Sequence, residues 1–437
     1  MSNKAPVSIC WLRRDLRLDD NTALFHALTS PYPVVVLFIF DQNILSKLEN
    51  KTDKRVLFIY QQIIRLSSEL QQHGSSLLVK YGNPVEVWKA LLNEWNVKSV
   101  HVNHDYESYG VQRDRQVAQL LSEKGASFQS YKDVVVFEKE EVMKDDGTPY
   151  VVFTPYSRKW KELLSRRGFQ IYNTSEHFQH FFKMYSKPVL PLAEIGFHAS
   201  DFSFPAKVIK SDIVNRYAEQ RDFPAIEGTS RLSVHLRFGT LSVRKLLQYA
   251  LSKSNTFVNE LIWRDFYHSI LYHFPYVEKG SFRKQYDAIP WLNNEEHFAR
   301  WCAGTTGYPL VDAGMRELNE TGFMHNRVRM VVSSFLTKHL LTDWRWGEAY
   351  FAQKLLDYDL AANVGGWQWA AGCGTDAAPY FRIFNPASQA VRFDPKNEYI
   401  KRWVPEFGTT AYPAPIVEHE MARNRCLATY KKALGSV

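Results

Sequence analysis

Cysteine is scarce in this chain of 437 residues, which has four, at positions 10, 302, 373 and 426. They form no Cys-x-x-Cys pair and have no histidine partners at zinc-binding spacing. The sequence therefore excludes a disulfide framework, and we expect reduced thiols and no structural metal.

Long apolar runs are missing as well. The longest, residues 34–40, falls far short of the roughly 20 residues that span a bilayer. The N-terminus also lacks the basic and then apolar pattern of a signal peptide, so we expect a soluble, cytoplasmic protein with no membrane partner. No internal repeat or low-complexity tract occurs, which excludes a repeat architecture.

Charged and aromatic residues are plentiful by contrast. The net charge is +8, the pI is near 9.0, and the basic excess lies mostly after residue 130, so a polyanion would bind the later part of the chain. Aromatic residues make up 14% of the sequence. They suit stacking on a cofactor or on bases, although a hydrophobic core could absorb many of them.

The first 131 residues alternate short apolar runs with amphipathic stretches. We predict strands at residues 7–12, 34–40, 77–80, 99–102 and 127–131, and helices at about 21–29, 53–73, 84–95 and 109–124. This alternation is typical of a parallel sheet with helices on both faces. We therefore predict a doubly wound α/β domain over residues 1–131.

A dinucleotide-binding fingerprint is missing from that domain. The first predicted strand runs into the charged residues 13–20 instead of Gly-x-Gly-x-x-Gly, which disfavours a nicotinamide site. Such a run is by default a solvated loop, and the sequence alone supports that interpretation and a functional one equally.

The rest of the chain changes character twice. Residues 132–204 have a loose, proline-rich pattern that is typical of a long connector. From residue 205 to residue 437 strand-like alternation nearly vanishes, and helical periodicity runs through 240–274, 310–341 and 345–359. We predict that this second domain is all-helical.

The densest chemistry lies in residues 357–369. Asp357, Asp359 and Asn363 stand among two tryptophans and a glycine pair that weakens any helix there. A flat ligand with a polar edge and an aromatic body would satisfy this mixture, and a flavin is such a ligand.

Three further strings could carry chemistry, although each also has an ordinary structural explanation. Residues 228–233 place hydroxyls and backbone amides at a predicted helix start, which suits a phosphate or a simple cap. Residues 260–267 gather an acid, an indole and a guanidinium on one helix face, where they could hold a planar base or form a surface ion pair. In residues 325–330 two arginines lie on different faces, so one could meet a phosphate while the other pairs with Asp357.

In their order along the chain these strings resemble the photolyase and cryptochrome family, specifically the class I cyclobutane pyrimidine dimer photolyases. The resemblance spans nearly the whole chain and rests on residues 11–18, 227–233, 260–267, 306–309, 324–330, 357–369 and 375–386. It implies an α/β antenna domain, a connector and a C-terminal all-helical FAD-binding domain.

The resemblance implies one non-covalent FAD that works as the reduced anion. The positions that match its phosphate and ribityl contacts are Tyr217, Thr229, Ser230, Arg231, Leu232 and Ser233. The positions that match its ring contacts are Asn326, Arg329, Asp357, Asp359 and Asn363. Among them, Arg329 and Asp357 would form an ion pair, and Asn363 would face flavin N5.

The resemblance also implies light-driven repair of UV-damaged DNA that contains pyrimidine dimers. The dimer would be flipped out of the duplex, as in other enzymes that act on bases. The positions that match the lesion pocket are Glu260, Trp263, Met330 and Trp369. The positions assigned to the DNA around the lesion are Arg264, Arg327, Arg382 and Gln389.

In the implied reaction, excited reduced FAD donates an electron to the dimer, the cyclobutane bonds split, and the electron returns. Glu260 would hydrogen bond to a dimer carbonyl. Trp367, Trp344 and Trp291 match the chain that photoreduces oxidised flavin, although spacing alone makes each an ordinary core residue. No metal or obligate protein partner is needed, and we expect a monomer.

The antenna chromophore is left open. Family members that use a folate place an Asn-Glu pair where this chain has Tyr109 and Gly110. Folate is therefore doubtful, and a deazaflavin, a second flavin or no antenna at all remain alternatives.

Three competing functions are less well supported. A cryptochrome-type blue-light photoreceptor is disfavoured by Asn363 and by the short tail after the helical part. A photolyase for the (6-4) photoproduct typically has a histidine pair, whereas here His325 is followed by Asn326. An unrelated flavin oxidoreductase is disfavoured by the missing dinucleotide fingerprint.

Overall fold

The computed structural model describes residues 4–185 and 187–435 and divides into two compact units. The first, which we call the sheet unit, comprises residues 1–138, 163–208 and 232–252. The second, which we call the helical unit, comprises residues 139–162, 209–231 and 253–437. The domain boundaries expected near residues 131 and 204 stay predictions.

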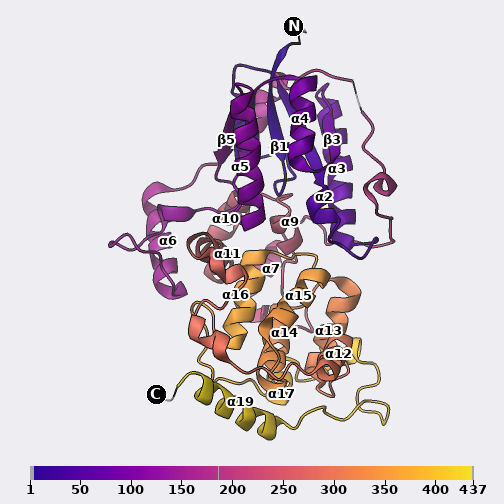
Figure 1. Ribbon diagram of the computed structural model, residues 1–437. Helices are drawn as coiled ribbons and strands as arrows, with labels where there is room; N and C mark the ends of the chain where they lie inside the picture. Colours follow the sequence, from indigo (N-terminus) through magenta and orange to yellow (C-terminus); the bar gives the residue numbers. More distant parts are fainter. Residues whose placement is uncertain (1–3, 186, 436–437) are drawn as a thin grey trace. The chain divides into compact units, whose positions relative to one another are not determined.

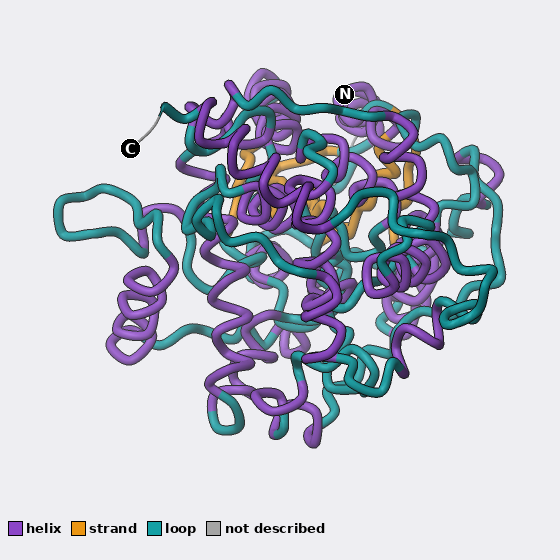
Figure 2. Tube along the Cα trace, turned by 90° about the horizontal axis from the view of Figure 1, so that it is seen from below, coloured by secondary structure: helices purple, strands orange, loops and turns teal. Residues whose placement is uncertain are grey.

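A five-stranded parallel sheet with the order β3-β2-β1-β4-β5 forms the centre of the sheet unit (Figure 1). Its strands are β1 (Pro6–Leu12), β2 (Val34–Asp41), β3 (Leu77–Gly82), β4 (Asn96–Asn103) and β5 (Ser127–Tyr131). Ile9 of β1 is level with Val35 of β2 and Val100 of β4. The five predicted strands are confirmed, and Figure 2 shows the strands gathered in one place with helices and loops around them.

Helices cover both faces of this sheet. They are α1 (Thr22–Leu28), α3 (Lys54–Gln72), α4 (Pro84–Glu94) and α5 (Ser108–Glu123), with the short α2 (Gln42–Leu45) after β2. The strand order reverses at β1, so right-handed crossovers place α1 and α3 on one face and α4 and α5 on the other. Trp88 of α4 and Leu121 of α5 share one core cluster with Ile9 and Trp11. The doubly wound fold is therefore confirmed.

The charged run after β1 is mostly buried, so the default interpretation as a solvated loop is wrong. Arg17 and Asp20 are at most 5% exposed. Arg17 donates to both carboxylate oxygens of Asp133, at 2.8 and 2.7 Å, and Arg244 donates to Asp20 and to Asp133. Burial alone would raise the pKa of Asp133, but the guanidinium groups of Arg17 and Arg244 lower it to about 2. These ion pairs hold the loop in place.

The sheet unit is completed by short helices. These are η2 (Thr174–His180), η3 (Leu192–Ile195), α9 (Ser233–Arg237) and α10 (Val243–Leu251). The helix α6 (Phe153–Arg167) lies inside the expected connector, mostly in the helical unit, and the sequence analysis did not predict it. Tyr156, Trp160 and Leu163 of α6 are buried at helical spacing, a stripe that could have indicated the helix.

The helical unit contains no strand longer than an isolated bridge among its described residues, as predicted. Its α-helices are α7 (Ser211–Asn215), α8 (Tyr217–Gln220), α11 (Asn255–His273), α12 (Glu295–Ala303), α13 (Pro309–Thr321), α14 (Asn326–Ser334), α15 (Trp344–Lys354), α16 (Leu360–Ala371), α17 (Pro386–Phe393), α18 (Glu398–Trp403) and α19 (His419–Ala433). Shorter turns of helix are η1 (Lys139–Glu141), η4 (Pro275–Glu278), η5 (Lys284–Ala288) and the π-helical η6 (Phe335–His339). Among the described residues of the whole chain, no helix combines the length and apolar character needed to cross a bilayer.

Candidate functional site

A cavity of about 370 Å³ in the helical unit brings together ten of the 22 residues that the sequence analysis assigned to the site. Its lining residues come from α11, α14, α15 and α16 and from the segments beside them. They are Arg221, Glu260, Trp263, Tyr267, Asn326, Arg329, Met330, Ser333, Phe351, Leu355, Asp357, Asp359, Ala362, Asn363, Gly366, Trp367 and Trp369. The volume lies in the range of small-molecule and cofactor sites.

One wall of the cavity is formed by α11. Ser254 caps this helix by accepting a hydrogen bond from the backbone N–H of Phe257. Glu260, Trp263 and Tyr267 then reach the cavity, because residues three and four apart share a helix face. The Trp263 indole lies flat on the Phe153 ring, with 3.6 Å between centroids. This stack holds the indole plane, and no sequence pattern indicated Phe153.

Glu260 is paired across the cavity lining with Arg221. Nη1 of Arg221 donates to Oε1 of Glu260, and the two side chains are 26% and 32% exposed. Burial raises the pKa of Glu260, while the guanidinium of Arg221 opposes that rise. The proton affinity of this carboxyl group therefore depends on its burial and on the charges of Arg221 and Asp222.

The second wall is formed by α14 and carries an ion pair. The His325 side chain caps the helix by accepting from the backbone N–H of Arg327. Arg329, on the cavity side, donates from Nη2 to Oδ2 of Asp357 at 3.0 Å and from Nε to the carbonyl of Met324 at 2.7 Å. The guanidinium is thereby held at the cavity edge with its plane fixed.

The third wall is formed by residues of the 357–369 string. Residues 360–371 form α16 although two glycines in it weaken the helix by propensity. Asp359 caps the helix by accepting from the backbone N–H of Ala362. Tertiary packing against α11 and α15 overrides the low helix propensity of glycine.

The two glycines of α16 have different roles. A Cβ on Gly365 would meet Cδ1 of Tyr267 at 2.3 Å, so this glycine allows α16 to pack closely on α11. A Cβ on Gly366 would meet no atom within 4 Å, and Gly366 lines the cavity. Gly366 therefore leaves open space at the point where a flat ligand would lie against the helix.

Asn363 is buried on α16 and is held by a residue that the sequence did not indicate. Its Nδ2 donates to Oε1 of Glu348 at 2.9 Å and to the carbonyl of Glu348 at 3.2 Å. Glu348 lies on α15, fifteen residues earlier in the chain, and no motif connects the two positions.

The expected tryptophan chain meets the cavity at one residue only. Trp367 is buried and lines the cavity, whereas Trp344, also buried, begins α15 and Trp291 is part-exposed. Trp367 has an edge-on ring contact with Trp301 at 6.0 Å, and Trp291 has one with Tyr430 at 6.0 Å. The sequence analysis did not single out Trp301.

The residues expected at the FAD phosphates lie outside the cavity lining. Tyr217 contacts the ring of Phe257 and the guanidinium of Arg221, which itself lines the cavity. Thr229, Ser230 and Arg231 belong to the helical unit, and Arg231 has φ +51° and lies over the ring of Phe323. Leu232 and Ser233 belong to the sheet unit. Ser233 is the first residue of α9, and Leu232 holds the N-cap position, where its apolar side chain accepts no hydrogen bond.

The residues expected at the DNA strand also lie outside the cavity lining. Arg327 donates to Asp222 at 2.8 Å, and Arg382 is exposed. Gln389 is half-buried on α17, and Arg264 is half-buried on α11.

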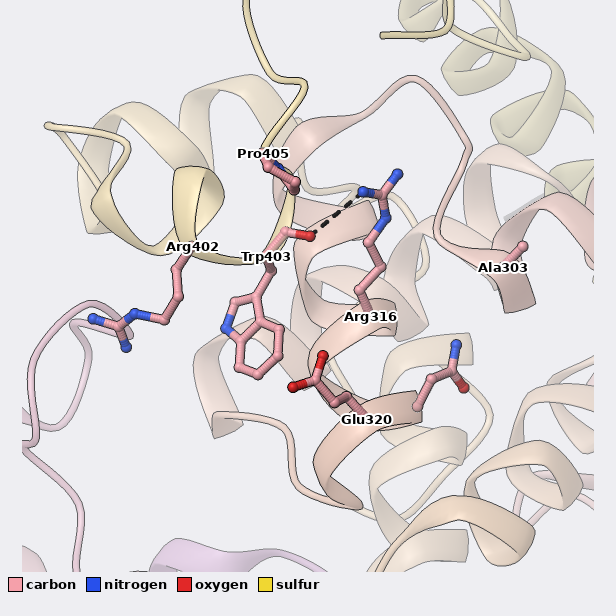
Figure 3. Close-up of a pocket in the computed structure, with 7 residues that line it drawn as sticks. Ala303, Arg316, Glu320, Arg402, Trp403 and Pro405 are labelled. Carbon is pink, nitrogen blue, oxygen red and sulfur yellow. Dashed lines mark hydrogen bonds between the residues drawn. The ribbon is translucent and has the colours of Figure 1, made fainter. Parts of the chain in front are cut away.

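A second hollow of the helical unit is larger, at about 770 Å³, but less suited to chemistry. Arg316, in its wall, is bound by both oxygens of Glu406 at 2.6 and 3.0 Å and by the carbonyl of Trp403 at 3.4 Å. The Asn319 side chain donates to the carbonyl of Cys302 and accepts from the hydroxyl of Tyr350. Figure 3 shows Arg316 turned to Trp403 and Arg402 pointing away from it. We therefore place the candidate site in the smaller cavity.

Comparisons with known proteins identify the family. Residues 8–174 match the family described as DNA photolyase, and residues 257–411 match the family described as FAD binding domain of DNA photolyase. The curated deoxyribodipyrimidine photo-lyase of Synechococcus is 37% identical, with 99% of this chain and 98% of that protein covered.

Two solved structures show the same fold. An archaeal photolyase from Sulfolobus tokodaii, described with two FAD molecules, is 34% identical with a TM-score of 0.82 over 97% of this chain and 99% of that one. A cryptochrome from Synechocystis is 26% identical with a TM-score of 0.85 over 98% and 100%. Full-length similarity to the curated photo-lyases, together with both family matches, establishes that the chain belongs to the DNA photolyase family.

Proposed function

We propose that this protein is a light-driven DNA repair enzyme, a deoxyribodipyrimidine photolyase that splits cyclobutane pyrimidine dimers. One observation carries the proposal. A single cavity of the helical unit is lined by one set of an acid, indoles and a methionine and by a second set of an ion pair, a carboxylate and an amide. The first set suits a flipped pair of bases and the second suits the polar edge of a flavin.

The residues present fit FAD. The open space beside Gly366 gives room for a flat ring against α16, and Asn363, Asp359 and the Arg329–Asp357 ion pair lie around that space. When bound in its reduced form, FAD supplies the electron that light transfers to the dimer.

The chain's own residues divide between cofactor and substrate. Asn326 joins the ring set, while Tyr217 and residues 229–233 are proposed for the phosphates and ribityl chain. Such a stretch can offer hydroxyl, backbone N–H and guanidinium donors to a phosphate. Trp367, Trp344 and Trp291 are proposed to supply electrons to oxidised cofactor.

Glu260, Trp263, Met330 and Trp369 are proposed to receive the dimer. Flat indoles exclude water and stack on bases, at about 1–3 kcal/mol per base. Glu260 is proposed to hydrogen bond a dimer carbonyl from its place in the cavity lining, where burial raises the pKa of its carboxyl group and Arg221 opposes that rise. Arg327 and Arg382 are proposed to contact phosphates, with Arg264 and Gln389 beside them.

The identity of a second, light-harvesting chromophore is a separate part of the proposal. A folate is disfavoured, because this chain has Tyr109 and Gly110 where folate-using members place an Asn-Glu pair. A glutamate could not replace Gly110 here, since its Cβ would lie 2.4 Å from Cγ of Asp105. Tyr109 is also engaged, since its hydroxyl donates to Asp41 at 2.6 Å. The related archaeal photolyase is described with a second FAD, and we propose a second flavin before a folate here.

Repair can be tested directly. Purified protein, reduced in the dark, should restore an oligonucleotide with one thymine dimer under blue light and leave it unchanged in the dark. Glu260→Ala should slow repair, whereas Glu420→Ala, at an exposed acid of α19, should not. The absorption spectrum of the cofactors released by denaturation should identify FAD and any antenna.

The competing photoreceptor function predicts another outcome. Failure to repair with fully reduced FAD bound, while damaged DNA still binds, would contradict the enzyme proposal and favour a cryptochrome role. We further propose a monomer that works in the cytoplasm, where its DNA substrate would lie, and sedimentation of the purified protein tests the oligomeric state.

A further inference from the structure

The Trp263 indole on the cavity wall is covered on one face by the ring of Phe153. The two rings are 3.6 Å apart between centroids and 3° from parallel. Trp263 lines the cavity, whereas Phe153 does not. Only the opposite face of the indole is therefore left for a flat ligand to stack on.

This stack is imposed by the protein around it. Aromatic pairs prefer an offset or edge-on arrangement to a face-to-face one, and parallel planes with centroids 3.6 Å apart leave almost no offset. The ring of Phe266, which is fully buried, lies edge-on to both partners, at 5.9 Å from Phe153 and 5.7 Å from Trp263. Phe266 thereby limits sideways movement of either ring.

The backbone at the start of α6 is tied to the loop that follows α16. The N–H of Phe153 donates to Oδ2 of Asp376 at 3.2 Å, and the Thr375 hydroxyl donates to the carbonyl of Val151. Thr375 is buried, and Asp376 has a left-handed backbone with φ +47°. Two hydrogen bonds therefore fix Phe153 relative to α16, the helix that forms another wall of the cavity.

An indole that is already held binds a flat ring at a lower entropic cost than a mobile one. An unsupported tryptophan side chain can occupy several rotamers. Ordering one such side chain on binding costs an amount that corresponds to roughly 3–10-fold in affinity. Phe153 removes this cost before a ligand arrives.

We propose that Phe153 is a positioning residue, which presets the plane of Trp263 so that the uncovered indole face receives a base of the substrate. The inference rests on the proposed function, in which Trp263 receives the flipped dimer. Because Phe153 lies outside the cavity lining, it contributes to the affinity for damaged DNA and not to the light-driven step.

Binding and repair kinetics separate these two contributions. Phe153→Leu keeps apolar bulk but has no flat face, and should weaken binding of a thymine-dimer oligonucleotide by roughly 3–10-fold. Repair at saturating dimer concentration, by protein with fully reduced FAD, should stay at the wild-type rate. Phe153→Tyr retains the flat ring and should bind the dimer as the wild type does. Val152→Ala, at the exposed neighbour, is the control and should leave the affinity unchanged.

The anchor of Phe153 provides a second, independent pair of variants. Asp376→Ala removes the acceptor of the Phe153 N–H, whereas Asp376→Asn retains an acceptor oxygen. The measured quantity is the ratio of the affinities for dimer-containing and undamaged DNA, because loss of a negative charge strengthens binding to any DNA. Asp376→Ala should lower this ratio and Asp376→Asn should not. Equal ratios in the two variants would overturn the inference, even if Phe153→Leu does not fold.

A double-mutant cycle shows whether the effect passes through the indole. In a Trp263→Ala background, Phe153→Leu should have no further effect on dimer affinity. A loss that persists in that background would overturn the inference, and so would a Phe153→Leu protein with full FAD content and unchanged dimer affinity. Wild-type protein with bound FAD that binds dimer-containing and undamaged DNA equally would instead contradict the proposed function.

Discussion

Trp367 is the one tryptophan of the expected chain that reaches the cavity. It is 2% exposed and packs between Phe351, at 4.9 Å, and Trp301, at 6.0 Å. Its surroundings therefore include two further aromatic rings of the helical unit. This position suits an electron donor to the cofactor better than a contact to the substrate.

Trp367→Phe should abolish photoreduction of oxidised FAD while leaving repair by chemically reduced protein largely intact. Phenylalanine fills most of the space but is far harder to oxidise than an indole. Absorbance of the flavin under blue light measures the first effect, and dimer repair after dithionite treatment measures the second. Trp403→Phe, outside the cavity, is the control and should change neither; loss of both activities in Trp367→Phe would mean that the residue has another role.

Single residues also mark the limit of sequence analysis. Asp357, Asn363 and Trp369 could be selected because they lie in one dense string. Glu348 and Phe153 could not, because each is connected to the site only by contacts with a residue distant in the chain. Such contacts leave no periodicity or motif behind.

At the scale of elements, α16 decides the geometry of the cavity. Its glycines look alike in sequence, yet Gly365 faces the Tyr267 ring and Gly366 faces the cavity. A helix places adjacent residues about 100° apart. Which of the two meets α11 depends on how the helices are docked, and no local pattern records that.

Gly365→Ala and Gly366→Ala form a matched pair. The first should lower the free energy of unfolding by about 1–3 kcal/mol, because the methyl group would overlap Tyr267. The second should raise it by up to about 1 kcal/mol in protein without cofactor, because alanine favours a helix, but should weaken FAD binding by filling open space. Urea denaturation and FAD titration measure the two effects; equal destabilisation by both would contradict the assigned packing.

At the scale of the whole molecule, buried histidines link stability to pH. Burial lowers the pKa of His101 to about 4 in the sheet unit, and in the helical unit it lowers the pKa of His325 to about 4 and that of His339 to about 3. An unfolded histidine binds a proton near pH 6.5. These groups therefore contribute stability that is fully present above pH 6.5 and lost as the pH falls toward 4.

His325→Asn should reduce this acid sensitivity. Asparagine can still cap α14 but takes up no proton, so the fall in unfolding free energy between pH 6.5 and pH 4 should shrink by roughly 1 kcal/mol per pH unit. Buried carboxyl groups with raised pKa values, such as Glu317, act in the opposite direction, so the comparison is between variant and wild type at each pH. His198→Asn, at an exposed histidine, should leave the wild-type dependence unchanged.

The doubly wound sheet could be inferred from the chain alone, because buried parallel strands and amphipathic helices have local periods that burial imposes on neighbouring residues. The classes of cofactor and substrate were inferred from short motifs whose order along the chain resembles that of the photolyase and cryptochrome family. The cavity itself depends on tertiary structure. Only the docking of α11, α14, α15 and α16 brings Glu260, Arg329 and Asn363 to one space, because side-chain contacts between distant segments are set by packing and not by spacing.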